Sequence, residues 1–249
     1  MATATMPPTT AEVVLNTRKK DRVFFSGMAF LILATTLVGF ARTYFLAGMF
    51  RAHLPSPIIH LHGAVFSLWI LWLISQTTLV AAHRTDIHRK LGLVGFGLAA
   101  LMPIFGVLAA TNSLSRNFAP PGFPFGAQTF YVVPLGDILV FGVLACFAYR
   151  ARRDPSAHKR LIMVATFAIM DAPTGRPPFA AITGAPHMDV LFCMIFLLLL
   201  VAYDLWSLRK VHPATLWAGI FMIVVQQIRI PIGMSAPWHH FAAWAQHLG

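Results

Sequence analysis

The sequence predicts an all-α membrane protein, a polytopic bundle of seven transmembrane helices with a cytoplasmic N-terminus and the C-terminus outside. Three observations support this fold class. The 249 residues are 57% hydrophobic and 11% charged, with a mean hydropathy of +0.70, whereas about a quarter of the residues of a soluble domain are charged. Apolar runs long enough to cross a bilayer recur along the chain. Lys and Arg cluster in alternate segments between these runs.

The chain divides into a polar leader, a transmembrane domain and a short tail. We expect residues 1–22 to form a disordered cytoplasmic tail, because they lack the charged, apolar and small-residue order of a cleaved signal peptide. Residues 23–232 hold the transmembrane domain, and residues 233–249 are expected to form an amphipathic tail on the outer side. The spans are expected at about residues 23–49, 64–82, 91–111, 128–149, 161–184, 188–206 and 214–232.

Prolines predict departures from straight helices in two of the spans. Pro103 lies inside the third span and is expected to kink it, because proline removes a backbone hydrogen bond. The fifth span contains Pro173, Pro177 and Pro178 and is expected to be broken. Non-helical backbone at membrane depth is tolerated where protein buries it or where it lines a cavity.

The distribution of basic residues sets the orientation. Of the 19 Lys and Arg residues, 14 lie in segments that are cytoplasmic if the N-terminus is inside, and the remaining five lie in outer segments or outer halves of spans. The positive-inside rule therefore favours an odd number of spans in a bacterial inner membrane. The basic residues form short clusters between apolar runs rather than one soluble face, so the sequence does not predict nucleic-acid binding.

Histidines lie near both predicted membrane faces. His60 and His62 precede the second span, and His88 follows it. His158 and His212 stand at the cytoplasmic starts of the fifth and seventh spans. Histidines of different helices at one depth can hold a b-type heme, and arginines suit its propionates. The candidate cofactor-binding residues are His60, His62, His88, His158 and His212, with Arg42, Arg176 and Arg229 as contacts for heme, a quinone or a small anionic ligand.

One hairpin resembles a known pattern. The matching residues are His60-x-x-Gly63, Gln76 and His88-Arg89-x-x-Gly92. They resemble a motif in uncharacterised multi-span proteins of the bacterial inner membrane, over about residues 58–100, and this resemblance implies a membrane location. The layout of the histidines is also similar to that of diheme membrane cytochromes of the b561 kind, which implies heme b and electron transfer across the membrane.

The outer histidines suggest a metal site as an alternative. A catalytic zinc ion takes three protein ligands, often histidine, and one water. His60 and His62 would point the same way if Pro55 and Pro57 kept the start of the second span extended. The arrangement weakly resembles seven-span zinc hydrolases such as the alkaline ceramidases and adiponectin receptors. The candidate ligands for zinc, or for copper instead, are His60, His62, His239 and His240.

Polar side chains within the spans are the remaining candidate site. Asp137 and Asp171 lie near the middle of the fourth and fifth spans. A lone charge there costs at least about 2.5–3.5 kcal/mol on insertion scales, so each carboxylate needs a partner, a proton or water. The predicted buried polar set is Asp137, Asp171, Gln226 and Gln227. This set suits either an ion-pair network between helices or a polar cavity.

No recognised catalytic motif occurs in the sequence, so no catalytic residue is predicted. The leading hypothesis is a heme-associated or quinone-associated electron-transfer protein of the inner membrane. The alternatives are a proton-coupled transporter, or an accessory subunit of a membrane complex, with a site at Asp137, Asp171 and Arg176, and a seven-span zinc hydrolase. The expected partners are the lipid bilayer, a quinone or small anionic ligand, and other membrane-complex subunits.

Overall fold

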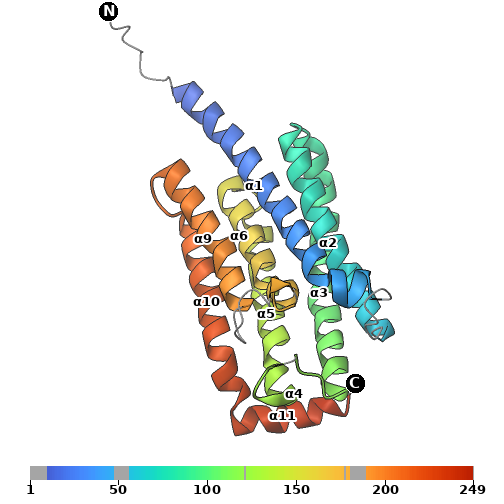
Figure 1. Ribbon diagram of the computed structural model, residues 1–249. Helices are drawn as coiled ribbons and strands as arrows, with labels where there is room; N and C mark the ends of the chain where they lie inside the picture. Colours follow the sequence, from blue (N-terminus) through green and yellow to red (C-terminus); the bar gives the residue numbers. More distant parts are fainter. Residues whose placement is uncertain (1–9, 48–55, 121, 177, 180–188, 249) are drawn as a thin grey trace, which may run out of the picture.

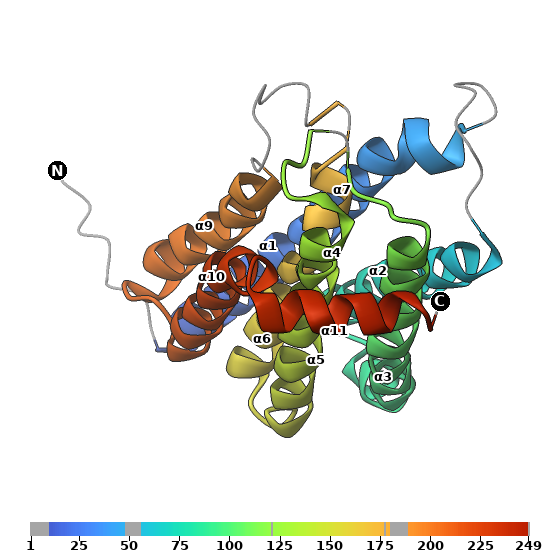
Figure 2. The ribbon, with the colours of Figure 1, turned by 90° about the horizontal axis from the view of Figure 1, so that it is seen from below.

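The computed structural model describes residues 10–47, 56–120, 122–176, 178–179 and 189–248. The secondary structure in these ranges is helical, and the long helices run side by side as a bundle, with α11 lying across one end (Figures 1 and 2). The helices are α1 (Thr10–Phe40), its π-helical continuation η1 (Ala41–Phe45), α2 (Pro57–Ala81), α3 (Thr85–Ser115), α4 (Gly126–Phe130), α5 (Val132–Arg150), α6 (Pro155–Ala168), α7 (Asp171–Thr174), α9 (Asp189–Leu208), α10 (Pro213–Gly233) and α11 (Ala236–Gln246).

Five helical segments of the described chain are long and apolar enough to cross a membrane. They are Lys19–Phe45, Pro57–Ala81, Thr85–Ser115, Gly126–Arg150 and Pro213–Gly233. These segments correspond to the first, second, third, fourth and seventh predicted spans. Many of their large apolar side chains point outward, such as Leu93, which is 61% exposed. An apolar outer surface of this extent suits lipid rather than water, so the chain has the character of an integral membrane protein.

The fifth predicted span is not one continuous helix. Helix α6 ends at Ala168 and the four-residue α7 follows. Pro173 has no backbone N–H for the carbonyl four residues earlier, which explains why the α-helical ladder stops here. The fourteen residues of α6 span only about 21 Å, short of a hydrocarbon core of about 30 Å. In the sixth predicted span, helix α9 includes the apolar segment Cys193–Leu208.

The predicted N-terminal disorder is wrong from Thr10 onward, because α1 begins there; residues 1–9 lie outside the described ranges. Contacts with distant helices hold the part of α1 around Asp21. Asp21 pairs with Lys159 Nζ of α6 at 2.6 Å and accepts a hydrogen bond from the Tyr203 hydroxyl of α9 at 2.7 Å. The ring of Phe24 stacks on that of Tyr203, with centroids 3.9 Å apart. The part of the predicted polar tail around Asp21 is thus anchored to α6 and α9 by tertiary contacts.

The core of the bundle lies around α5 and α6. Phe141 and Leu144 of α5 and Phe167 of α6 are almost completely buried. Trp69 of α2 packs edge-on against Phe141 at 5.1 Å and donates a hydrogen bond to Thr166 Oγ1 at 3.2 Å. This apolar packing fixes the positions of the helices that carry the buried polar residues.

Replacing Gly39 by alanine is expected to destabilise the bundle by about 1–3 kcal/mol. Helix α1 meets α7 here so closely that an added methyl group would collide with the Pro173 carbonyl oxygen, and backbone atoms cannot rotate away. Gly27→Ala on the same helix is the matched control, because a methyl group there meets nothing within 4 Å. Thermal unfolding of the detergent-purified variants checks the expectation. Equal stability of the two variants would contradict the close contact.

Candidate functional site

An ion-pair network joins α5, α7 and α10 inside the bundle. Arg229 donates from Nη1 to Asp137 Oδ1 at 2.6 Å and from Nη2 to Asp171 Oδ2 at 2.7 Å. The three residues are only 4–8% exposed. The prediction that Asp137 and Asp171 are buried and need partners is therefore confirmed, and one guanidinium serves both carboxylates.

Asp171 also contacts α9 and a second side chain of α10. Its Oδ1 accepts a hydrogen bond from the Cys193 thiol of α9 at 2.6 Å, and the Gln226 amide of α10 lies 3.4 Å from Oδ2. Cys193 also lies within 3.2 Å of the Phe167 carbonyl oxygen. Asp171 thus links the break between α6 and α7 to both α9 and α10.

Charge in the network is unbalanced among its three ionised side chains. Asp137 and Asp171 provide two carboxylates, and Arg229 provides one positive charge. In a medium of low dielectric constant, two carboxylates so close to each other repel, and the one guanidinium between them offsets part of that repulsion.

One polar prediction for α10 is wrong, and another stays a prediction. Arg229 is the residue predicted to contact an anionic ligand, and both of its terminal nitrogens donate to carboxylates. Gln227 was expected to be buried and is exposed, whereas Gln226 is 5% exposed. Residues 226 and 229 are three positions apart and share a helix face, while residue 227 is turned about 100° from residue 226.

The candidate ligands His88, His158 and His212 form two groups. His88 of α3 and His158 of α6 face each other, with ring centroids 6.5 Å apart. His158 Nδ1 lies 2.9 Å from the Ala148 carbonyl oxygen. The Nδ1 atom of His88 and both polar atoms of the Gln76 side chain are buried with no hydrogen-bond partner among the described residues. Of the residues in the hairpin motif, Gln76 and His88 thus have unused hydrogen-bonding capacity.

His212 has a structural role at the start of α10. Its Nδ1 accepts a hydrogen bond from the Ala214 N–H at 3.1 Å, and its own N–H donates to Asp204 Oδ2 at 3.1 Å. Burial and the nearby positive charge of Arg160 lower the pKa of His212. The neutral ring that this favours is the form that can accept the hydrogen bond at the helix N-terminus.

The prediction of an extended approach to His60 and His62 is wrong, because α2 begins at Pro57 and both residues are helical. Two residues apart on a helix, they point in different directions. The His60 Nδ1 atom lies 2.7 Å from the Tyr44 hydroxyl, and His62 packs against Phe66 with ring centroids 4.0 Å apart. Each histidine is thus held by a different neighbour.

The second pair of candidate metal ligands is also divided. His239 of α11 lies 3.2 Å from the Thr129 hydroxyl and 3.1 Å from the side-chain oxygen of Gln128, whereas His240 is exposed. Among the residues that the structure describes, no group of three or more His, Cys, Asp or Glu side chains could hold a metal ion. The four candidate ligands therefore do not form the predicted zinc or copper site.

The other two predicted anion contacts, Arg42 and Arg176, lie on or near η1 and α7. Arg42 is an exposed residue of η1. Arg176 donates to the Ala172 carbonyl oxygen, and its guanidinium lies 4.4 Å from the centre of the Phe40 ring. Arg176 is thus not the partner of Asp171, although it is five residues away in the sequence.

Sequence reasoning missed a second buried ion pair, between Arg160 of α6 and Asp204 of α9. The Arg160 Nε and Nη2 atoms lie 2.9 and 2.5 Å from Asp204 Oδ1, and the side chains are 1% and 0% exposed. The Thr215 hydroxyl donates to Asp204 Oδ2 at 2.6 Å. An aspartate at the end of an otherwise apolar span was the available signal. It was easily overlooked because charged residues at span ends are usually solvated.

The fold and the buried network define an integral membrane protein of helical-bundle type with a polar site inside its apolar domain. No protein-family model matches the chain, and neither the curated proteins nor the solved structures contain a significant match. Functional inference therefore depends on the chemistry of the site.

Proposed function

We propose that the protein is a proton-coupled membrane transporter in which Asp137 and Asp171 form the proton-binding site. The observation that carries this proposal is the sharing of one guanidinium by two buried carboxylates. One proton bound by Asp171 converts its carboxylate to a carboxylic acid and leaves Arg229 paired with Asp137. Loss of that proton restores both ion pairs. The excess of carboxylate over cation favours a solute that is neutral or positively charged.

The position of Asp171 supports coupling between protonation and movement. It lies where α6 ends and α7 begins, and Arg229 and Cys193 tie it to α10 and α9. Neutralising Asp171 weakens its bond to Arg229, because hydrogen bonds between two charged groups are about twice as strong as neutral ones. The short α7 can then move relative to α10. Broken helices at the binding site are common in secondary transporters.

We also propose seven spans in a bacterial inner membrane, with the N-terminus in the cytoplasm. The turns between α2 and α3, α5 and α6, and α9 and α10 lie toward one end of the bundle (Figure 1). These turns carry Arg84, Arg152, Arg153, Arg209 and Lys210. The positive-inside rule places that end in the cytoplasm. The segment α6–α7 and helix α9 would provide the two crossings that are not among the five long apolar helices.

Infrared spectroscopy of the protein in lipid vesicles tests the proton-binding site without knowledge of the solute. On acidification, the wild type is expected to gain the carbonyl band of a buried protonated carboxyl group. The band should be lost in Asp171→Asn, with Asp137 remaining ionised beside Arg229. Asp86→Asn is the control, because this side chain is 63% exposed. A wild type without the band, or a band unchanged by Asp171→Asn in a folded protein, would refute the proposal.

One observation favours heme-associated electron transfer as a second candidate function. Metal–nitrogen bonds of about 2.0 Å place two imidazole rings on opposite sides of one metal with centres roughly 6 Å apart, close to the 6.5 Å between His88 and His158. An absorption spectrum of protein purified from heme-producing cells tests it. A Soret band that is lost in His88→Ala would support heme binding. A colourless wild type would exclude it and leave the proton-coupled proposal unaffected.

A further inference from the structure

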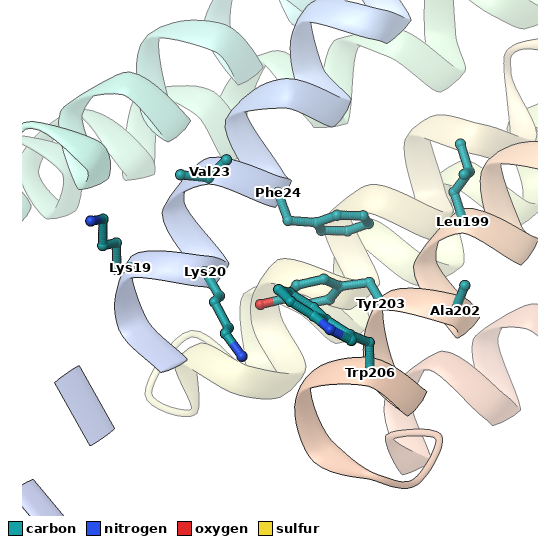
Figure 3. Close-up of a pocket in the computed structure, with 8 residues that line it drawn as sticks. All are labelled: Lys19, Lys20, Val23, Phe24, Leu199, Ala202, Tyr203 and Trp206. Atoms are coloured by element: carbon teal, nitrogen blue, oxygen red, sulfur yellow. The ribbon is translucent and has the colours of Figure 1, made fainter. Parts of the chain in front are cut away.

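An open groove runs between α1 and α9. It lies near the basic end of the bundle, the end at which the turns carry Arg84, Arg152, Arg153, Arg209 and Lys210. It has a volume of about 550 Å³. Figure 3 shows the residues that line it, with Phe24 and Lys20 of α1 facing Tyr203 and Trp206 of α9. The lining residues are Lys19, Lys20, Val23 and Phe24 of α1 and Leu199, Ala202, Tyr203 and Trp206 of α9. The groove is separate from the buried carboxylates, so a ligand bound in it is independent of the proposed transport function.

The walls of the groove are apolar and aromatic. Phe24 and Tyr203 stack at 3.9 Å between ring centroids and form one continuous surface. Trp206 lies next to Tyr203, at 6.1 Å, and is 59% exposed. Val23 and Leu199 are also exposed. Exposed apolar side chains of this kind suit an acyl chain, and tryptophan is typical of the membrane–water interface.

The rim of the groove is positively charged. Lys20 Nζ lies 4.1 Å from the centre of the Trp206 ring. Lys19 is exposed, and its side chain points away from Trp206 at the outer edge of the groove (Figure 3). The adjacent acidic residue, Asp21, pairs with Lys159 instead. Within the described part of the chain, neither Lys19 nor Lys20 forms a salt bridge. The Lys20 ammonium thus lies at the aromatic wall of the groove, and Lys19 adds a second positive charge at its outer edge.

We propose that this groove binds an anionic phospholipid of the adjacent leaflet. The phosphate lies at Lys20, with Lys19 adding positive charge at the outer edge, and one acyl chain follows Val23, Leu199 and Ala202. Charge complementarity favours this occupant over a zwitterionic lipid, since basic pockets between transmembrane helices bind anionic headgroups. Trp206 forms the boundary between the headgroup and the acyl chain.

Quenching of Trp206 fluorescence by brominated lipids tests the proposal. The protein is reconstituted in phosphatidylcholine vesicles that contain the same fraction of either brominated phosphatidylglycerol or brominated phosphatidylcholine. The difference between the wild type and Trp206→Phe isolates the signal of this tryptophan. Phosphatidylglycerol is expected to quench Trp206 more strongly than phosphatidylcholine does. The double variant Lys19→Gln/Lys20→Gln is expected to bind phosphatidylglycerol about 30-fold more weakly, at about fivefold per lysine.

The matched control is Arg89→Gln/Lys90→Gln, which removes two exposed charges from the same end of the bundle outside the groove. It should leave the preference for phosphatidylglycerol unchanged. Circular dichroism establishes that both double variants are folded. Equal quenching by the two lipids in the wild type would overturn the proposal. So would a preference retained without Lys19 and Lys20. A second copy of the chain in the groove would shield Trp206 from both lipids alike, and that result would also contradict the proposal.

Discussion

Replacing Arg229 by glutamine is expected to lower the free energy of unfolding by about 3–5 kcal/mol, the cost of removing one partner from a buried ion pair. The substitution leaves Asp137 and Asp171 without the guanidinium that binds both of them. Two like charges are then buried without compensation, and at least one carboxyl group must take up a proton. Unfolding of the detergent-purified protein by SDS, followed by tryptophan fluorescence, measures the loss.

Two further variants test whether the loss of stability comes from uncompensated charge or from lost packing. Gln227→Ala lies on the same helix but is exposed, and it should change stability by no more than about 0.5 kcal/mol. The triple variant Arg229→Gln/Asp137→Asn/Asp171→Asn removes all three charges. It should be more stable than Arg229→Gln alone, because its buried amides carry no charge. If the triple variant is as unstable as the single one, uncompensated charge is not the cause of the loss.

Asp204→Asn is expected to produce a loss of similar size, about 3–5 kcal/mol, at the basic end of the bundle. The carboxylate accepts hydrogen bonds from Arg160, from Thr215 and from the backbone N–H of His212. Asparagine keeps the shape but leaves the Arg160 guanidinium buried without a counter-charge. The SDS unfolding curve again provides the measurement.

The control at this end is Arg209→Gln, because Arg209 is exposed in the turn after α9. It should leave the unfolding curve nearly unchanged. Arg160→Met/Asp204→Leu tests the charge argument further, since replacing a buried ion pair by apolar residues is often close to neutral. A double variant less stable than Asp204→Asn would show that the hydrogen-bonding shape of the site matters more than its charge.

The two ion-pair networks hold α10 at two points. Thr215 near its start contacts the pair of Arg160 and Asp204, and Arg229 near its end binds Asp137 and Asp171. Fourteen residues separate the two points, about 21 Å along the helix. The first network contains one acid and one base, whereas the second contains two acids and one base. Protonation is therefore expected to release the second attachment of α10 and α7 while the first one stays in place.

The histidines and the carboxylates are conspicuous in the sequence for different physical reasons, and the structure gives them different surroundings. Histidine near membrane faces is common at the level of the headgroups, and His60 and His239 have ordinary hydrogen-bond partners. The Nδ1 atoms of His62 and His88 are buried with no such partner among the described residues, and His88 faces His158. Asp137 and Asp171 were conspicuous because an isolated charge within a span is costly, and they do meet in one network.

Hydrophobicity and the placement of prolines by themselves determined the membrane-protein class, the five long apolar helices and the interruption before Pro173. These are local properties of the chain, because the length of an apolar run and a missing N–H do not depend on distant residues. Only the tertiary structure decided the partners. Asp137 and Asp171 pair with Arg229, 92 and 58 residues away, and Asp204 pairs with Arg160, 44 residues away. Which helix faces meet depends on the packing of the whole bundle, and no local pattern encodes it.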